Sequence, residues 1–178
     1  MKINPLSISF VTSLFGMLTA AILLLTASAA NAVTLNFTTG WNLVGNSVNA
    51  PLTVATDFNN AANVATVWKW IPATGKWAFY TPTQTDGGAA YATGKGYDFL
   101  ATINGGEGFW VNAKLLFALT LAGTTPYSLG TSDLTAGWNL VSTGDVLSPA
   151  QLDTKLGGAT GAPSFKTMWA WNATGSNW

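Results

Sequence analysis

The most obvious chemistry in this sequence belongs to aromatic side chains placed around one short turn. Trp68, Trp70, Trp77 and Tyr80 lie on either side of residues 72–75. A flat aromatic face can pack on the apolar C–H face of a sugar ring, while nearby polar groups bond the sugar hydroxyls. The spacing therefore indicates a ligand-binding surface, with Trp68, Trp77 and Tyr80 as its contact residues.

The aromatic residues also have a purely structural explanation. Large apolar side chains at alternating strand positions commonly form the core of a small module. We expect a core position for four Trp residues: Trp41, Trp70, Trp110 and Trp138. For Trp68, Trp77 and Tyr80 the choice between core and ligand surface stays open. The alkyl stems of Lys69 and Lys76, at the ends of the same turn, can cover aromatic faces.

Carboxylates are the other groups that could do chemistry, as the acid and base of a glycoside hydrolase. That reaction needs two acids separated by roughly 5–9 Å across a cleft. The candidates are Asp57, Asp86, Asp98 and Glu107. No motif places a second acid near any of them, so we expect solvated surface acids. Asp86 lacks the dense Asp and Asn ladder of a calcium loop, so no metal site is predicted.

The composition excludes most other catalytic machinery. The 178 residues include no Cys, His or Arg, and 7 Lys balance 7 acidic residues. The sequence therefore offers no thiol or imidazole catalyst and no Cys/His zinc site, and no cofactor is predicted. A net charge near zero gives no electrostatic footprint for nucleic acid. We expect a protein that is not an enzyme.

The N-terminus has the pattern of an export signal. Lys2 precedes an apolar run over residues 8–27, and the small-x-small sequence Ala30-Asn31-Ala32 follows. This pattern predicts a signal peptide over residues 1–32 with cleavage near Ala32. The alternative is an uncleaved membrane anchor. A cleaved chain without Cys fits a bacterial periplasm or cell surface.

The elements that must position the aromatic residues come from a sequence repeat. Residues 38–44 (TTGWNLV) return as residues 135–141 (TAGWNLV), and the block around 67–77 returns in the same order at 168–178. Two motifs recurring in order indicate a tandem repeat. We predict a complete first repeat over 33–123, a linker over 124–131, and a truncated second repeat over 132–178. An ending inside the repeat indicates a fragment of a longer product, or a half-module that completes the first.

Short periodicities predict a mainly β or α+β fold: a small antiparallel module with one short helix per repeat. Residues 35–44 alternate as one strand, and residues 65–70 and 76–80 form a hairpin turned at Gly75. Pro51 opens a short helix. In the second repeat, Ser148 as N-cap, Pro149 after it and Gly157 as terminator predict its counterpart.

Three blocks in order carry a family resemblance: GWNLV at residues 40–44, VWKW at 67–70 followed by Trp77, and GGEGFWVN at 105–112. Together they resemble an uncharacterised repeat module of exported bacterial, especially proteobacterial, proteins. The resemblance implies an exported location and a modular architecture, and it transfers no catalytic residue.

These observations predict an exported, non-catalytic surface module for adhesion, envelope assembly or glycan contact. Its expected partners are glycans or other envelope proteins, with no nucleic acid, and a membrane only through an uncleaved signal segment. Two alternatives stay open: a glycan-active enzyme that uses a carboxylate pair, and a purely structural spacer.

Overall fold

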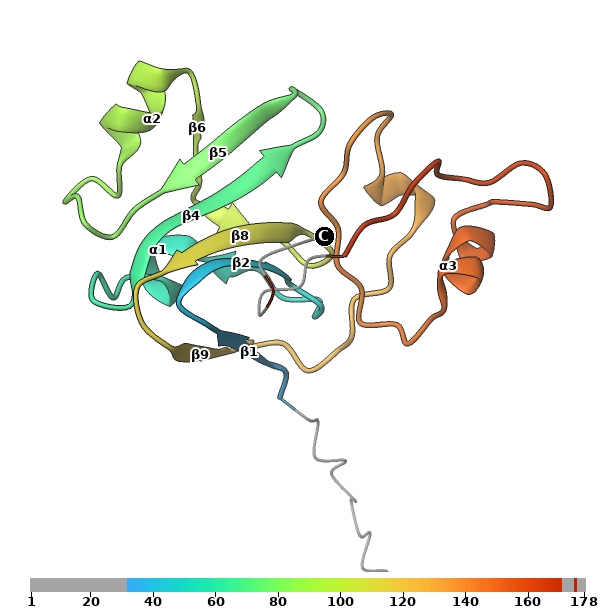
Figure 1. The fold of residues 1–178 in the computed structure, drawn as a ribbon, viewed down its shortest axis with the longest axis horizontal. Helices are drawn as coiled ribbons and strands as arrows, with labels where there is room; N and C mark the ends of the chain where they lie inside the picture. Colours follow the sequence, from blue (N-terminus) through green and yellow to red (C-terminus); the bar gives the residue numbers. More distant parts are fainter. Residues whose placement is uncertain (1–31, 171–174, 176–178) are drawn as a thin grey trace, which may run out of the picture.

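The computed structural model describes residues 32–170 and residue 175. Apart from Ala32, the predicted signal peptide lies outside the described residues, and so do Trp171 and Trp178. The first repeat forms a β fold, and the residues after Thr124 lie to one side of it (Figure 1). The mainly β class is therefore confirmed.

A five-stranded sheet with the order β2-β8-β4-β5-β6 forms the centre of the fold. Its strands are β2 (Gly40–Gly45), β4 (Val64–Ile71), β5 (Lys76–Tyr80), β6 (Asp98–Phe99) and β8 (Gly108–Ala113). All neighbours are antiparallel except β5 and β6. The predicted hairpin is confirmed as β4 and β5, and Gly75 has the positive φ of 62° that its turn needs.

Two small strand pairs and two helices complete the first repeat. β1 (Thr34–Phe37) pairs with β9 (Phe117–Thr120), and β3 (Leu52–Thr53) pairs with β7 (Thr102–Ile103). The helix predicted after Pro51 is the single turn α1 (Val54–Asp57). A second helix, α2 (Ala89–Lys95), is also present, so the prediction of one short helix per repeat is wrong for the first repeat.

Phenylalanine and aliphatic side chains fill the core on one face of the sheet. Phe37 stacks on Phe117 with ring centroids 4.3 Å apart, and Phe58 meets both Phe37 and Phe109 edge to face. Aliphatic residues from the sheet and its flanking strands surround these rings: Val64, Val67, Val111, Leu52, Leu100, Ile103 and Leu121. No Trp belongs to this core within the described part of the chain.

The single strand predicted for residues 35–44 is wrong, because the chain breaks after Phe37 and continues in another sheet. Gly40 takes a φ of 95°, which other residues rarely adopt. The side chain of Asn42 holds this bend, accepting from the backbone N–H of Thr38 and donating to the carbonyls of Thr38 and Gly40. Phe37 thus enters the core, whereas Trp41 lies 45% exposed on a different sheet.

The second repeat does not form the sheet of the first within the described residues. By analogy with residues 35–44, the repeat predicts a strand at residues 134–141, and this prediction is wrong: only an isolated bridge joins Val141 to Glu107. Met168, Trp169 and Ala170 also lie outside any strand. A two-stranded unit is only marginally stable without partners, and the GGEGFWVN block that forms β8 occurs once in residues 1–178.

The helix predicted in the second repeat is confirmed as α3 (Pro149–Lys155). The Ser148 hydroxyl accepts from the Gln151 N–H, and the Gln151 side chain accepts from the Ser148 N–H, which forms a capping box. Gly157 follows with a φ of 87°. Ser, Pro and Gly at these positions explain both ends of the helix.

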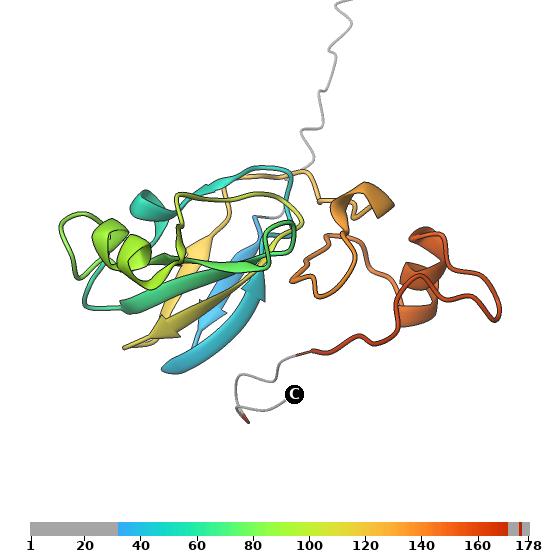
Figure 2. The ribbon, with the colours of Figure 1, turned by 90° about the horizontal axis from the view of Figure 1, so that it is seen from above.

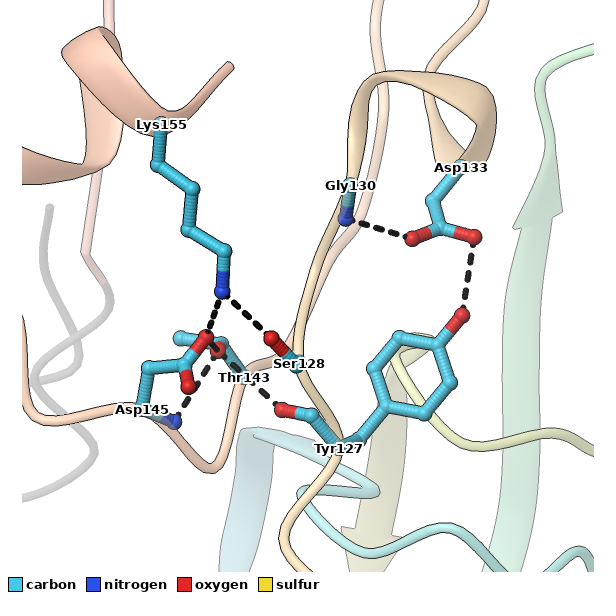
Figure 3. Close-up of polar contacts among 7 residues, drawn as sticks. All are labelled: Tyr127, Ser128, Gly130, Asp133, Thr143, Asp145 and Lys155. Atoms are coloured by element: carbon cyan, nitrogen blue, oxygen red, sulfur yellow. Dashed lines mark hydrogen bonds and ion pairs between the residues drawn. The ribbon is translucent and has the colours of Figure 1, made fainter.

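Polar contacts fasten α3 to residues 124–131, the predicted linker. Lys155 bonds Ser128 and pairs with Asp145, and the Tyr127 hydroxyl donates to Asp133 (Figure 3). This segment also packs on the first repeat, since Leu129 is buried and the Tyr127 N–H donates to the Ser47 carbonyl. A 3-10 turn, η1 (Thr131–Asp133), begins at its last residue. The linker is therefore a packed connection.

Candidate functional site

An aromatic groove of about 940 Å³ lies on the face of the sheet opposite the core. Seven of the nine Trp residues line it, and no charged side chain does so within the described residues. Its lining consists of Trp41, Trp68, Trp70, Trp77, Tyr97, Trp110, Trp138, Asn139, Leu140 and Trp169. A large concave apolar surface with few polar groups is the usual form of a ligand site.

Strand register explains why the Trp side chains gather there. Trp68 lies opposite Trp110 across β4 and β8, and Trp70 lies opposite Trp77 across β4 and β5. Directly opposed residues project from the same face of a sheet. Their sequence neighbours Val67 and Val111 project from the other face into the core. The period of two therefore separates Trp from the core along every central strand.

The two predicted contact residues Trp68 and Trp77 both line the groove, and the third, Tyr80, does not. Tyr80 is only 4% exposed and belongs to the core, where burial raises the pKa of its phenol. It lies an odd number of positions from Trp77 along β5, which places the two side chains on opposite faces. Tyr80 therefore cannot contact a ligand in the groove.

The expected core positions of Trp41, Trp70, Trp110 and Trp138 are wrong. All four line the groove, and Trp138 is 69% exposed. The physical reason is that Phe37, Phe58 and Phe109 already fill the space on the core face. A close-packed interior has no room for further large rings.

Perpendicular ring contacts shape the wall of the groove. Trp41 meets Trp110 at an interplanar angle of 85°, and Trp68 meets Trp77 at the same angle. Tyr97 meets Trp68 at 79°, with centroids 5.2 Å apart. Edge-to-face pairs are a favoured arrangement of aromatic rings. They hold one another in place and leave ring faces directed along different sides of the groove.

Polar atoms are few in the groove. The Trp70 Nε1 donates to the backbone carbonyl of Trp138 at 2.9 Å. The side chain of Asn139 is engaged with Thr135 and Gly137. The Trp68 Nε1 is buried and has no hydrogen-bond partner among the described residues. Aromatic faces, rather than polar groups, therefore provide most of what a ligand could contact.

The second repeat contributes Trp138, Asn139, Leu140 and Trp169 to the groove. The segment that follows α3 runs back toward the sheet (Figure 2), which brings Trp169 to this surface. The sequence predicts no site residue in this repeat, and it does not predict Tyr97 either. The repeated GWNLV motif was the available signal, because it places a second Trp in the context of Trp41.

The four candidate acids do not gather in the groove, since none of them lines it. Glu107 pairs with Lys69 at 2.8 Å and accepts from the Asn104 N–H. Lys69 is 7% exposed on the core face, so its predicted role of covering the hairpin aromatics is wrong. Asp86 accepts from the N–H groups of Ala90 and Gly88, which lower the pKa of its carboxyl.

Within residues 32–170 and residue 175, no cluster of three or more acidic residues could hold a metal ion. No helix there has the length and apolar character needed to cross a bilayer.

Comparison with protein-family models, with curated proteins and with solved structures returns no match for this chain. The chemistry of the groove therefore carries the functional argument.

Proposed function

We propose that the chain is an exported, non-catalytic surface module that contacts neutral glycans through the aromatic groove. Export rests on the signal pattern of residues 1–32, which directs the chain to the periplasm or cell surface. The observation that carries the binding proposal is the placement of Trp41, Trp68, Trp70, Trp77 and Trp110 on the sheet face away from the core.

A glycan suits this lining because a sugar ring has an apolar C–H face and a polar rim. The C–H face packs on an indole ring, and the hydroxyls stay in contact with water at the open side. The absence of charged side chains from the described lining favours an uncharged sugar over an acidic one. Ring stacking without charged partners predicts modest affinity.

Non-catalytic contact is preferred over glycan hydrolysis because none of the four candidate acids lines the groove, and two of them have other partners. Glu107 pairs with Lys69, and Asp86 binds backbone N–H groups at the start of α2. A hydrolase needs two carboxyl groups facing one cleft. Release of reducing sugar from any glycan, abolished in a folded Glu107→Gln variant, would overturn this part of the proposal.

Binding to defined polysaccharides tests the proposal. The chain, exported by a bacterial host and purified, is run in gels containing a β-1,4-glucan, an α-1,4-glucan or a polymer of β-1,4-linked N-acetylglucosamine. We expect retardation by at least one polymer and a roughly tenfold loss of affinity in Trp77→Ala, equivalent to about 1.4 kcal/mol. Trp68→Ala tests the neighbouring ring in the same way.

Tyr91→Ala provides the matched control, because Tyr91 is an exposed aromatic residue that does not line the groove. Its affinity should equal that of the unaltered chain, and circular dichroism should show all three variants folded. Unfolding of both Trp variants would instead support a structural role, and absence of retardation by every polymer would contradict glycan contact.

Assembly with neighbouring copies is the second candidate function. It is favoured by the backbone bonds that already join the second repeat to the first, from Gly108 to Leu140 and from Ser142 to Gly106. Light scattering separates the two functions: assembly predicts a mass that rises with concentration and falls in Trp77→Ala. A monomeric mass at every concentration, together with no binding of glycans, would leave the structural spacer as the function.

A further inference from the structure

The groove is built from both repeats, and this arrangement points to the size of its ligand. Trp41 and Trp138 occupy the same position in the two GWNLV motifs, and both line the groove. Resting on the proposed glycan function, we propose that the groove binds an extended glycan chain across the two repeats, with Trp138 determining specificity for chain length.

The second repeat is docked by backbone pairing rather than by loose contact. The Gly108 N–H donates to the Leu140 carbonyl at 2.9 Å, and the Ser142 N–H donates to the Gly106 carbonyl at 2.8 Å. The Trp70 Nε1 adds a bond of 2.9 Å to the Trp138 carbonyl. These three bonds, at the alternate backbone positions 138, 140 and 142, fix Trp138 relative to the floor of the groove.

Residues 106–108 pair with both repeats: the chain that follows each GWNLV motif, or the motif itself, lies along one of their two edges. On the edge that pairs with the first repeat, the Asn46 N–H donates to the Glu107 carbonyl, and the Gly106 N–H donates to the Asn46 carbonyl. Glycine favours this close approach, because a Cβ at Gly108 would lie 3.1 Å from the Leu140 carbonyl carbon, which is a tight contact. Residues 106–108 therefore hold the second repeat in place and also pair with the first repeat.

Gly45 and Ser142 show how closely the repeats meet. They occupy equivalent positions after the two GWNLV motifs, and a Cβ added at Gly45 would overlap the Ser142 side chain. Gly45 does not itself line the groove. A larger residue there would push the second repeat away and leave the groove surface of the first repeat unchanged.

The dimensions of the groove favour several linked sugar rings. Its volume of about 940 Å³ is near the upper end of the roughly 300–1,000 Å³ typical of small-molecule sites. Its Trp residues extend from Trp77 on β5 to Trp138 on the second repeat. A terminal sugar would use only part of this surface, whereas a chain of neutral sugars could contact both repeats.

An oligosaccharide ladder tests this inference. Tryptophan fluorescence is titrated with β-1,4-linked oligomers of glucose and of N-acetylglucosamine, from one to six units. We expect the unaltered chain to bind the hexamer at least about tenfold more tightly than the dimer. In Trp138→Ala this gain of affinity with chain length should vanish, because the longer oligomers lose their contact with the second repeat.

Gly45→Val probes the docking itself, with Gly94→Val as its control, since a Cβ at Gly94 meets nothing within 4 Å. Hydrogen exchange at the Ser142 and Gly108 amides should accelerate in Gly45→Val alone, together with loss of the length dependence. This inference would be overturned if affinity still rose with oligomer length in both Trp138→Ala and Gly45→Val, although amide exchange was accelerated in Gly45→Val. The proposed glycan function would then still stand. No binding of any oligomer or polymer by the unaltered chain would overturn both.

Discussion

The two copies of the GWNLV motif have the same local geometry but different structural roles. Asn42 binds Thr38 and Gly40 through its side chain, and Asn139 binds Thr135 and Gly137 with the same atoms. The backbone torsion of the glycine in each motif also agrees, with φ of 95° at Gly40 and 99° at Gly137. The five residues 38–42, and their counterparts 135–139, are therefore sufficient to specify this bend.

The copies diverge where a partner strand is needed. In the first repeat the motif becomes β2 and pairs with β8 over its whole length. In the second repeat the motif pairs only with residues 106–108, along their free edge. Local hydrogen bonds can form anywhere in a chain, whereas a strand requires a neighbour supplied by distant sequence. The comparison separates local from long-range determinants of one motif.

The largest difference between the repeats should come from their ion pairs. Lys69 and Glu107 form a pair whose lysine is 7% exposed, whereas Lys155 and Asp145 pair at the surface. Glu107→Gln leaves the buried lysine without its counter-ion, and because Glu107 keeps a 32% exposed side chain we expect a loss of about 2–3 kcal/mol. Asp145→Asn should shift the urea midpoint far less.

Urea unfolding followed by tryptophan fluorescence measures both variants. Lys69→Met is the second variant of the buried pair, because it removes the buried charge instead of isolating it. It should be less destabilising than Glu107→Gln. Equal midpoints for Glu107→Gln and Asp145→Asn would show that burial does not distinguish the two pairs.

The next largest difference should come from the two asparagines. Asn42 is 1% exposed, so Asn42→Ala removes a buried side chain together with its part-buried bonds to Thr38 and Gly40, and should cost about 2 kcal/mol. Asn139 is more accessible, and water can replace its bonds, so Asn139→Ala should cost less than about 0.5 kcal/mol. If urea unfolding gave equal losses of unfolding free energy for the two variants, the bend itself, and not its burial, would set the energetic cost.

Sequence reasoning succeeded where the determinants are local. Alternation with a glycine turn predicts β4 and β5, and Ser148 with Pro149 predicts α3. It failed at residues 38–40, because uninterrupted alternation hides a break that the Asn42 side chain creates.

The site was predicted only in part for a related reason. A period of two assigns residues to two faces of a strand without revealing which face is the core. That choice depends on Phe37, Phe58 and Phe109, which are far apart in the sequence and meet only in the folded chain. Trp68 and Trp77 were therefore identified, Tyr80 was assigned to the wrong face, and Trp41, Trp70, Trp110 and Trp138 were assigned to the core.

A smaller difference should separate the two helix N-termini. The Ser148 hydroxyl caps α3, whereas Thr53, the residue before α1, makes no side-chain capping bond. Ser148→Ala should destabilise α3 by about 1 kcal/mol and accelerate exchange of the Gln151 amide roughly fivefold. Thr53→Ala should leave amide exchange at the end of α1 unchanged. Similar acceleration in both helices would show that the capping bond adds nothing beyond helix propensity.

The smallest difference concerns two surface carboxyls whose pKa values are lowered for different reasons. A hydrogen bond from Lys155 lowers the pKa of Asp145, and a hydrogen bond from Thr143 also contributes. Backbone N–H groups of Ala90 and Gly88 lower the pKa of Asp86. In both cases the stabilisation is present above the ordinary Asp pKa of about 3.9 and is lost as pH falls through the lowered value.

Salt should distinguish the two carboxyls, because it screens an exposed ion pair more than a hydrogen bond to backbone. Carboxyl chemical shifts are followed by NMR across the acid range at about 0.05 M and about 0.5 M NaCl. The pKa of Asp145 should rise toward its ordinary value at high salt, while that of Asp86 stays nearly constant. Lys155→Met should reproduce the effect of salt on Asp145 alone. Equal salt shifts for both carboxyls would mean that the ion pair in the second repeat is held by its hydrogen bonds rather than by charge.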